Sequence, residues 1–212
     1  DLLLSEMAGL FPEDYFHLGG DEVDGDCWLE DPVIRKWAEG KGVTWKEQLV
    51  ALFSARIVHR TAQLGRRPVI WDEALEMVPH LSRYIPPGAY FSTLTIDAWR
   101  DWQHIDLGDG GRIERWQSAP AAGHQVVWSS LSWYLDLPNN KWESIYALEM
   151  PATPPKAFLG GEASSWSESA DATNVQQRSL TRLAAAAERL WSREPSKLVV
   201  TKQRLASLRC RL

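Results

Sequence analysis

The sequence predicts an α/β fold built from parallel β/α units. Short apolar runs alternate with segments of helical periodicity along its 212 residues, and turns rich in glycine and proline separate them. Polar and aromatic residues directly follow the apolar runs, which is where a β/α barrel carries its active site. Five such units can be counted, too few to close an eight-stranded barrel.

The strands are predicted from five apolar runs, which are Tyr15 to Leu18, Pro68 to Trp71, Ala89 to Ile96, Gln125 to Trp128 and Ala157 to Leu159. The first of them reads as a buried strand. Helices are predicted at Trp45 to Leu64, which has an apolar stripe, at the alanine-rich Ala184 to Trp191, and at the basic segment Ser196 to Leu212. Turns are predicted at Pro86-Pro87-Gly88, Gly108-Asp109-Gly110-Gly111 and Pro138-Asn139-Asn140.

Composition limits the classes of function. Residues 1–212 fit one domain, and the net charge of -5 argues against a nucleic-acid partner. No apolar run approaches the roughly 20 residues of a transmembrane helix. The first residue is Asp1 rather than Met, which suggests a fragment or a processed chain. The cysteines, Cys27 and Cys210, could pair with each other, stay free or pair outside this chain, and they fit no zinc site.

The most informative motif is His17-Leu18-Gly19-Gly20-Asp21-Glu22-Val23. Two glycines end the first strand and permit the backbone to kink, so that the neighbouring carboxylates of Asp21 and Glu22 can serve one site. Paired carboxylates at a strand end suit acid–base chemistry on a sugar bond. Alternatively, the two acids simply cap a following helix. A calcium loop through Asp21, Asp24, Asp26 and Glu30 lacks the glycine it needs where it turns, so no metal site is predicted.

Three further strand ends carry a tryptophan close to an acid. These are Trp71-Asp72-Glu73, Trp133-Tyr134-Leu135-Asp136, and the segment from Gly160 to Glu168 that contains Glu162 and Trp166. The chain has 12 tryptophans, and an indole is a flat apolar plate that can stack on a sugar ring. Glu73 and Glu162 are expected to be buried hydrogen-bonding partners, and His17 to support the strands from inside. The tryptophans assigned to packing are Trp28, Trp37, Trp45, Trp116, Trp142 and Trp191.

Together with Cys27-Trp28 and Glu188-Arg189-Leu190-Trp191-Ser192, these motifs resemble glycoside hydrolase family 20 in order and content. The likeness is greatest to eukaryotic β-N-acetylhexosaminidases of the lysosomal group, and it runs from about Phe11 to the C-terminus. The resemblance implies a (β/α)8 TIM barrel, of which this chain holds about strands four to eight. It implies no metal or organic cofactor.

The resemblance also implies a retaining, substrate-assisted mechanism in which the 2-acetamido oxygen of the substrate attacks the anomeric carbon. Glu22 is then the acid and base, Asp21 holds the acetamido N–H, and Tyr134 hydrogen-bonds the acetamido oxygen. The residues expected to bind the sugar are Trp71, Trp99, Asp136, Trp166 and Glu168, with Trp102 as a competitor for the place of Trp99. Ser164, Ser165 and Ser167 depart from the usual family pattern, which bears on specificity.

Relatives imply that Cys27 bonds to a cysteine upstream and Cys210 to one beyond the C-terminus, in a lysosomal, vacuolar or secreted protein. The expected substrate is a glycan or small molecule with a terminal N-acetylhexosamine. Relatives are often dimers, so the resemblance leaves a homo-oligomer of the full-length protein open, and the sequence does not fix the oligomeric state. The arginine that grips the sugar in relatives lies on the first strand, so the isolated chain is expected to be inactive. The alternatives are a non-catalytic sugar-binding module and an inactive gene fragment.

Overall fold

A computed structural model describes residues 1–73, 94–100, 104–106, 112–114, 119–120, 123–149, 156–192 and 196–211. The predictions for Pro86-Pro87-Gly88, Gly108 to Gly111, Trp102 and Trp116 lie outside these residues. So does most of the predicted strand at Ala89 to Ile96.

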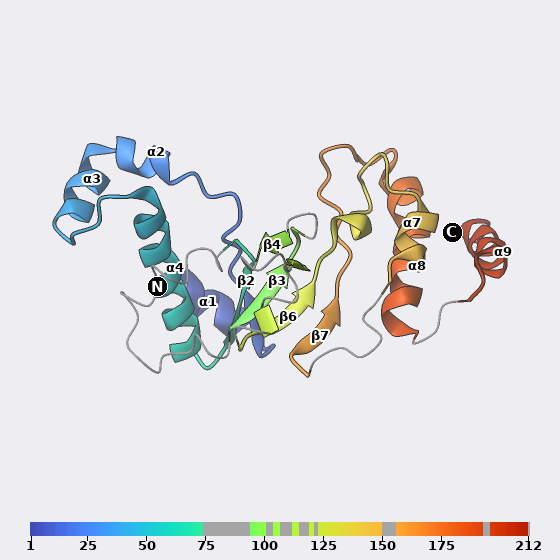
Figure 1. The fold of residues 1–212 in the computed structure, drawn as a ribbon, viewed down its shortest axis with the longest axis horizontal. Coiled ribbons are helices and arrows are strands. Elements are labelled where there is room, and N and C mark those ends of the chain that lie inside the picture. Colours follow the sequence, from blue (N-terminus) through green and yellow to red (C-terminus); the bar gives the residue numbers. More distant parts are fainter. Residues whose placement is uncertain are drawn as a thin grey trace.

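A parallel five-stranded sheet forms the centre of the molecule (Figure 1). Its order is β1-β2-β3-β6-β7, and each neighbouring pair is parallel. The strands are β1 (Tyr15–His17), β2 (Arg67–Trp71), β3 (Thr95–Ala98), β6 (Gln125–Trp128) and β7 (Phe158–Gly161). The sheet confirms the α/β class and the location of four predicted strands, while β3 overlaps the predicted Ala89 to Ile96 only at Thr95 and Ile96 and continues to Ala98. Among the described residues, β1 and β7 pair on one side only.

Helices flank the sheet at both ends of the molecule (Figure 1). The N-terminal group is α1 (Leu2–Leu10), α2 (Gly25–Glu30), α3 (Pro32–Glu39) and α4 (Lys46–Gln63). The C-terminal group is α7 (Trp142–Ala147), α8 (Val175–Trp191) and α9 (Leu198–Arg209), with a 3-10 turn, η2 (Leu131–Trp133), after β6. A short antiparallel pair, β4 (His104–Asp106) and β5 (Arg112–Glu114), completes the described elements. The three predicted helices correspond to α4, the second half of α8, and α9.

Local sequence explains where several helices begin. The side chain of Asp24 accepts a hydrogen bond from the Asp26 N–H at the start of α2. Asp31 accepts from the N–H groups of Val33 and Ile34, and Pro32 occupies the first turn of α3. Side-chain acceptors of this kind satisfy the free N–H groups of the first helical turn, and proline has no N–H to lose there.

The main core lies around the sheet and draws on the helices of the C-terminal half and on Val58 of α4. It includes Ile70 of β2, Ile96 of β3, Val126 of β6, and the fully buried Trp133. β1 is more exposed than predicted, with Tyr15 40% exposed, because it lies at the edge of the sheet. A sheet edge lacks a neighbour that would cover its side chains.

The packing assignment of tryptophans is only partly correct. Trp28 packs on Phe53 with ring centroids 5.5 Å apart, and Trp142 packs against the main core. Trp37, Trp45 and Trp191 are instead exposed, Trp191 to 90%, because they lie on helix ends that no described element covers. The sequence shows how many tryptophans there are but not which helix faces find a partner.

Cys27 and Cys210 are both free and exposed. They lie on α2 and at the end of α9, at opposite ends of the molecule (Figure 1), so they do not pair with each other. Within the described parts of the chain, no helix is long and apolar enough to cross a membrane.

Candidate active site

The turn after β1 carries the neighbouring acids. Pairing with β2 continues beyond the strand, because the Leu18 N–H donates to the Val69 carbonyl and the Trp71 N–H donates to the Gly19 carbonyl. Gly19 and Gly20 then adopt φ values of +70° and +99°, the left-handed region that glycine tolerates best. The predicted kink is confirmed, and it starts within two residues of Asp21.

Glu22 is fixed through its backbone. Its φ is 50°, which is unusual for a residue other than glycine, and its N–H donates to Oε2 of Glu73 over 2.7 Å. Glu73 follows β2, so its carboxylate at the end of β2 fixes the turn that follows the neighbouring strand β1. The Glu22 side chain is exposed, while Asp21 is half-buried.

His17 links β1 to β3. Its Nδ1 accepts a hydrogen bond from the Gly19 N–H at 3.0 Å, so the ring proton resides on Nε2 in the neutral imidazole. Nε2 lies 3.2 Å from Oδ2 of the buried Asp97 and donates to it. The ring also packs edge-on against Trp71 at 4.9 Å. His17 therefore supports the strands through these contacts, but its side chain is 36% exposed, so it is less enclosed than expected.

An aromatic group lies at the ends of β2 and β7. The ring of Trp166 has its centroid 5.9 Å from that of Trp71 and 5.7 Å from that of Tyr134. Trp71 and Tyr134 are buried, whereas Trp166 is 44% exposed. Three residues predicted to serve one site, from segments far apart in the sequence, thus form one group with an indole open to solvent.

The segment Ser164–Ser169 holds the loop that carries Tyr134 and Asp136. Tyr134 forms an isolated parallel bridge with Ser164, and the Leu135 N–H donates to the Ser164 carbonyl over 2.8 Å. Asp136 is 1% exposed, and its Oδ2 accepts from the Ser167 N–H at 2.9 Å. Its other oxygen, Oδ1, is buried without a hydrogen-bond partner among the described residues. A buried acceptor without a partner can accept a hydrogen bond from a hydroxyl group of a ligand.

A second group of acids lies beneath the aromatic rings. Glu162 follows β7 and accepts a hydrogen bond from Ser129 Oγ at 3.2 Å, so it is a hydrogen-bonding partner as expected, although it is half-buried rather than buried. Burial raises the pKa of Glu162 to about 7, and the charge of neighbouring Asp97, together with its hydrogen bond to that carboxyl, adds to the effect. Ser129 and His17 partly oppose the rise. At neutral pH, Glu162 is therefore in part a neutral acid that donates to Asp97.

The same environment acts on Tyr134. Burial raises the pKa of its phenol well above the usual value, and the nearby charges of Asp97 and Glu162 raise it further. Polar contacts with Ser129 and Trp166 partly oppose this rise. The hydroxyl therefore stays protonated at any physiological pH and can serve as a hydrogen-bond donor.

A buried ion pair joins the segments that follow β2 and β3. Arg100 Nε lies 3.3 Å from Oδ1 of Asp72, and both side chains are almost completely buried. These two residues immediately follow Trp71 and Trp99, so the pair ties together the segments that carry the two indoles. Trp99 is half-buried, and Glu168 is exposed in the turn after β7.

Asp97 and Ser129 are the site residues that the sequence did not reveal. Asp97 is an acid inside the apolar strand Thr95-Ile96-Asp97-Ala98, and that placement was an available signal because unpaired acids are rarely buried. Ser129 gave no comparable signal. Within the described ranges, no group of three or more His, Cys, Asp or Glu side chains is placed to hold a metal ion.

Residues 1–194 match the family model for the glycosyl hydrolase family 20 catalytic domain. The chain belongs to glycosyl hydrolase family 20. It is 30% identical to the β-hexosaminidase subunit β of Sus scrofa over 98% of this chain and 37% of that protein. It is 32% identical to β-hexosaminidase 1 of Arabidopsis thaliana over 90% of this chain and 32% of that protein. The chain thus spans about a third of the length of these relatives.

Solved structures of the family share the fold. The chitobiase of Flavobacterium johnsoniae superimposes with a TM-score of 0.68 at 26% identity, over 98% of this chain and 31% of that one. The β-N-acetylhexosaminidase of Bacteroides fragilis gives a TM-score of 0.74 at 22% identity, over 98% of this chain and 42% of that one. The five parallel strands and their helices are therefore part of a family 20 TIM barrel.

Proposed function

We propose that this chain forms the acid–base and acetamido-binding part of an exo-β-N-acetylhexosaminidase that releases terminal β-linked GlcNAc or GalNAc. The observation that carries the proposal is the aromatic group of Trp71, Trp166 and Tyr134 beside the acid turn. The Trp71 N–H bonds to Gly19, two residues before Asp21, so the two features share one edge of the sheet.

The proposed reaction retains the anomeric configuration and uses the substrate's own amide as nucleophile. The acetamido oxygen attacks the anomeric carbon while Glu22 gives its proton to the departing glycosidic oxygen. The product of this step is an oxazolinium ion, whose N–H Asp21 holds and whose positive charge it stabilises. Water then attacks the same carbon, Glu22 takes its proton, and the acetamido group reforms.

Tyr134 is proposed to aim the attacking amide oxygen. Its hydroxyl stays protonated because burial raises its pKa, so it can donate to that oxygen throughout the reaction. The neighbouring Trp166, together with Trp71 and Trp99, is proposed to enclose the sugar ring by stacking. Oδ1 of Asp136 is buried and has no hydrogen-bond partner among the described residues, so it would accept a hydrogen bond from a sugar hydroxyl. Glu168 would accept a hydrogen bond from another hydroxyl.

We further propose that residues 1–212 act within a longer chain and are inactive alone. The chain spans 37% of the Sus scrofa relative, and β1 and β7 each lack a second partner among the described strands. Unpaired edges of a barrel sheet expose backbone groups and apolar surface. The bonding of Cys27 and Cys210 to cysteines outside this chain, a lysosomal, vacuolar or secreted location, and homo-oligomerisation belong to the same proposal.

Replacement of the proposed acid tests the function in the whole protein. Turnover of a nitrophenyl β-N-acetylglucosaminide should fall by about 10²- to 10⁴-fold in Glu22→Gln, because acid–base catalysis is removed. Binding of N-acetylglucosamine should persist. Glu30→Gln removes an equally exposed glutamate at the end of α2 and should keep full activity. A parent protein that binds the sugar without turnover would instead identify a binding module.

A substrate without the acetamido group tests the proposed mechanism. A nitrophenyl β-glucoside has a hydroxyl group in place of the acetamido group, so it offers no internal nucleophile. We expect it to be turned over far more slowly, even at concentrations that saturate the site. Comparable rates for the two substrates would show that the acetamido group does not take part in bond cleavage.

A further inference from the structure

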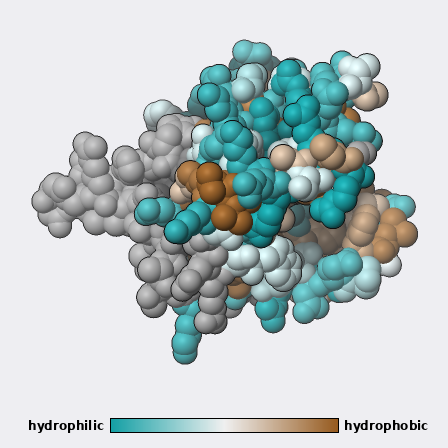
Figure 2. All heavy atoms as spheres, turned by 90° about the vertical axis from the view of Figure 1, so that its right-hand side faces the viewer, coloured by the Kyte–Doolittle hydropathy of each residue, from teal (hydrophilic) through white to brown (hydrophobic). Residues whose placement is uncertain are grey.

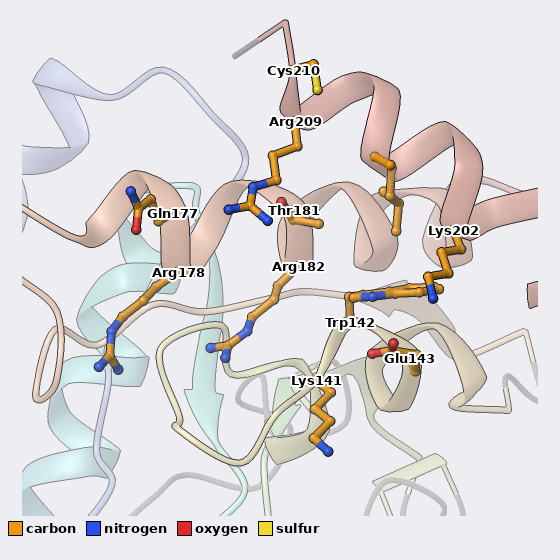
Figure 3. A pocket seen from close by; sticks show the side chains of 12 residues that line it. Lys141, Trp142, Glu143, Gln177, Arg178, Thr181, Arg182, Lys202, Arg209 and Cys210 are labelled. Atoms are coloured by element: carbon orange, nitrogen blue, oxygen red, sulfur yellow. The ribbon is translucent and has the colours of Figure 1, made fainter.

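A pocket of about 870 Å³ lies between α7, α8 and α9 (Figure 3). Five cationic side chains from all three helices and their flanks line it, and Glu143 is its one acid. The cations are Lys141, Arg178, Arg182, Lys202 and Arg209. The surrounding face of the molecule is mostly hydrophilic, with separate apolar patches (Figure 2). The charge of this pocket contrasts with the net charge of -5 of the whole chain.

The five cations outnumber the acids near them in the described parts of the chain: Asp136 acts on Arg182, Asp171 lies near Arg178, and Glu143 lines the pocket. None of them forms an ion pair within 4.0 Å there, although Arg56, Arg100 and Arg204 each do so elsewhere. Glu143 forms none either. A pocket lined by five cations and one acid keeps an excess of positive charge, and it attracts an anion because its walls concentrate the field.

Arg178 and Arg182 crowd each other. They lie four residues apart, on one face of α8, and both point toward the loop beneath that helix (Figure 3). Burial lowers the pKa of Arg182, and the charge of Arg178 lowers it further, while the charge of Asp136 partly opposes the change. An anion between or beside the two guanidinium groups would relieve this repulsion.

Both arginines retain donors for a ligand. Arg182 uses Nη1 to reach the carbonyls of Leu135 and Leu137, and Arg178 uses Nη1 to reach the carbonyl of Asp136. Neither Nη2 nor Nε of these two side chains donates a hydrogen bond to any described residue. Arg209 reaches from α9 toward α8 near Thr181, and Lys202 extends from α9 toward Trp142 (Figure 3).

We propose that this pocket is a binding site for a phosphate or sulfate group. A tetrahedral oxyanion offers acceptor oxygens in several directions, which suits donors that reach the pocket from two helices, whereas a carboxylate satisfies a single guanidinium fork. The ligand is either the free ion or the ester group of a larger molecule. The site lies outside the proposed sugar pocket, and it does not depend on the proposed enzymatic activity.

Calorimetric titration of the whole protein with inorganic phosphate at low ionic strength tests the site. The variant Lys202→Gln/Arg209→Gln removes two pocket charges but keeps the arginines that hold the loop. We expect roughly tenfold weaker phosphate binding in this variant, from the attraction that exposed charges usually contribute. Lys36→Gln/Lys41→Gln removes two exposed charges near α3, far from the pocket, and should leave the affinity unchanged.

Glu143→Gln supplies a test with the opposite sign. Removal of the one acid should tighten phosphate binding by roughly twofold to fivefold, a change that general loss of structure would not produce. Sulfate and a sugar phosphate are titrated in parallel. Binding of the free ions alone assigns an ion site, and tighter binding of the ester assigns a phosphorylated or sulfated ligand.

Three results would overturn the proposal. They are no phosphate binding at millimolar concentration, equal weakening in the pocket variant and the α3 control, and binding of an oligo-aspartate peptide in the absence of phosphate binding. Thermal unfolding of each variant without phosphate is measured alongside. It separates a lost ligand contact from a lost fold, because the parent and a folded variant should then unfold at similar temperatures.

Discussion

Glu162→Gln should remove a loss of folding stability that occurs as the pH rises. Glutamine has the shape of the protonated glutamic acid, so it can still accept from Ser129 Oγ, and its amide N–H can donate to Asp97. It cannot ionise. The substitution therefore keeps the side chain permanently in the neutral form that burial and the charge of Asp97 favour.

The size of the effect follows from the pKa of Glu162, which is raised from 4.5 to about 7. A group with a raised pKa in the folded state binds its proton more tightly there than in the unfolded chain. Its stabilising contribution is complete below 4.5 and is lost as the pH rises through about 7. The rise corresponds to an upper bound of about 3 kcal/mol. Because Glu162 is only half-buried, solvent screening reduces the expected effect to about 1–2 kcal/mol.

Urea unfolding of the parent protein and of Glu162→Gln at a series of pH values measures this difference. The two proteins should be about equally stable near pH 5, and the variant should be more stable by about 1–2 kcal/mol near pH 8. Glu39→Gln, on the exposed end of α3, controls for the change in net charge. A constant difference between parent and variant at every pH would refute the reasoning, because it would show that Glu162 carries no proton-linked stability.

Four other substitutions test the packing and the site. Gly161→Ala should destabilise the fold by about 3 kcal/mol, because its Cβ would lie 2.5 Å from Cζ3 of the fully buried Trp133. Gly9→Ala in α1 meets nothing within 4 Å and should stabilise slightly in the same unfolding assay. Tyr134→Phe keeps the ring contact with the indole but removes the hydroxyl, so kcat should fall by about 10²-fold with little change in stability. Asp136→Ala should raise KM more than it lowers kcat, since Oδ1 is proposed to bind a hydroxyl away from the reacting carbon.

Much of the fold follows from local sequence. Apolar runs and helix-favouring segments located four strands, the start of β3, α4, the second half of α8, and α9, because each pattern lies within one short segment. The helix α1 was missed because its apolar residues do not face a core, and Leu2 is 89% exposed. The exposure of β1 was missed for a related reason. Position in the sheet is set by long-range pairing, which one segment cannot reveal.

In the candidate site too, features that depend on one segment were predictable and features that depend on long-range pairing were not. The kink at Gly19-Gly20 and the gathering of Trp71, Tyr134 and Trp166 were predictable, because each lies at or after a strand end and parallel strand ends meet at one edge. The contact between Asp97 and Glu162 was not. It depends on the parallel register of β3, β6 and β7, which places an acid of one strand beside an acid that follows another.

This pairing of acids connects the two ends of the proposed site. Gly19, next to the acid turn, fixes the tautomer of His17, which donates to Asp97. Asp97 in turn raises the pKa of Glu162, and both acids raise the pKa of Tyr134. A proton that leaves Glu162 as the pH rises therefore places a second negative charge beneath the phenol that is proposed to hold the substrate amide. The added charge makes the phenol a weaker hydrogen-bond donor, so the same ionisation that lowers stability above about pH 7 should also lower the rate of amide attack.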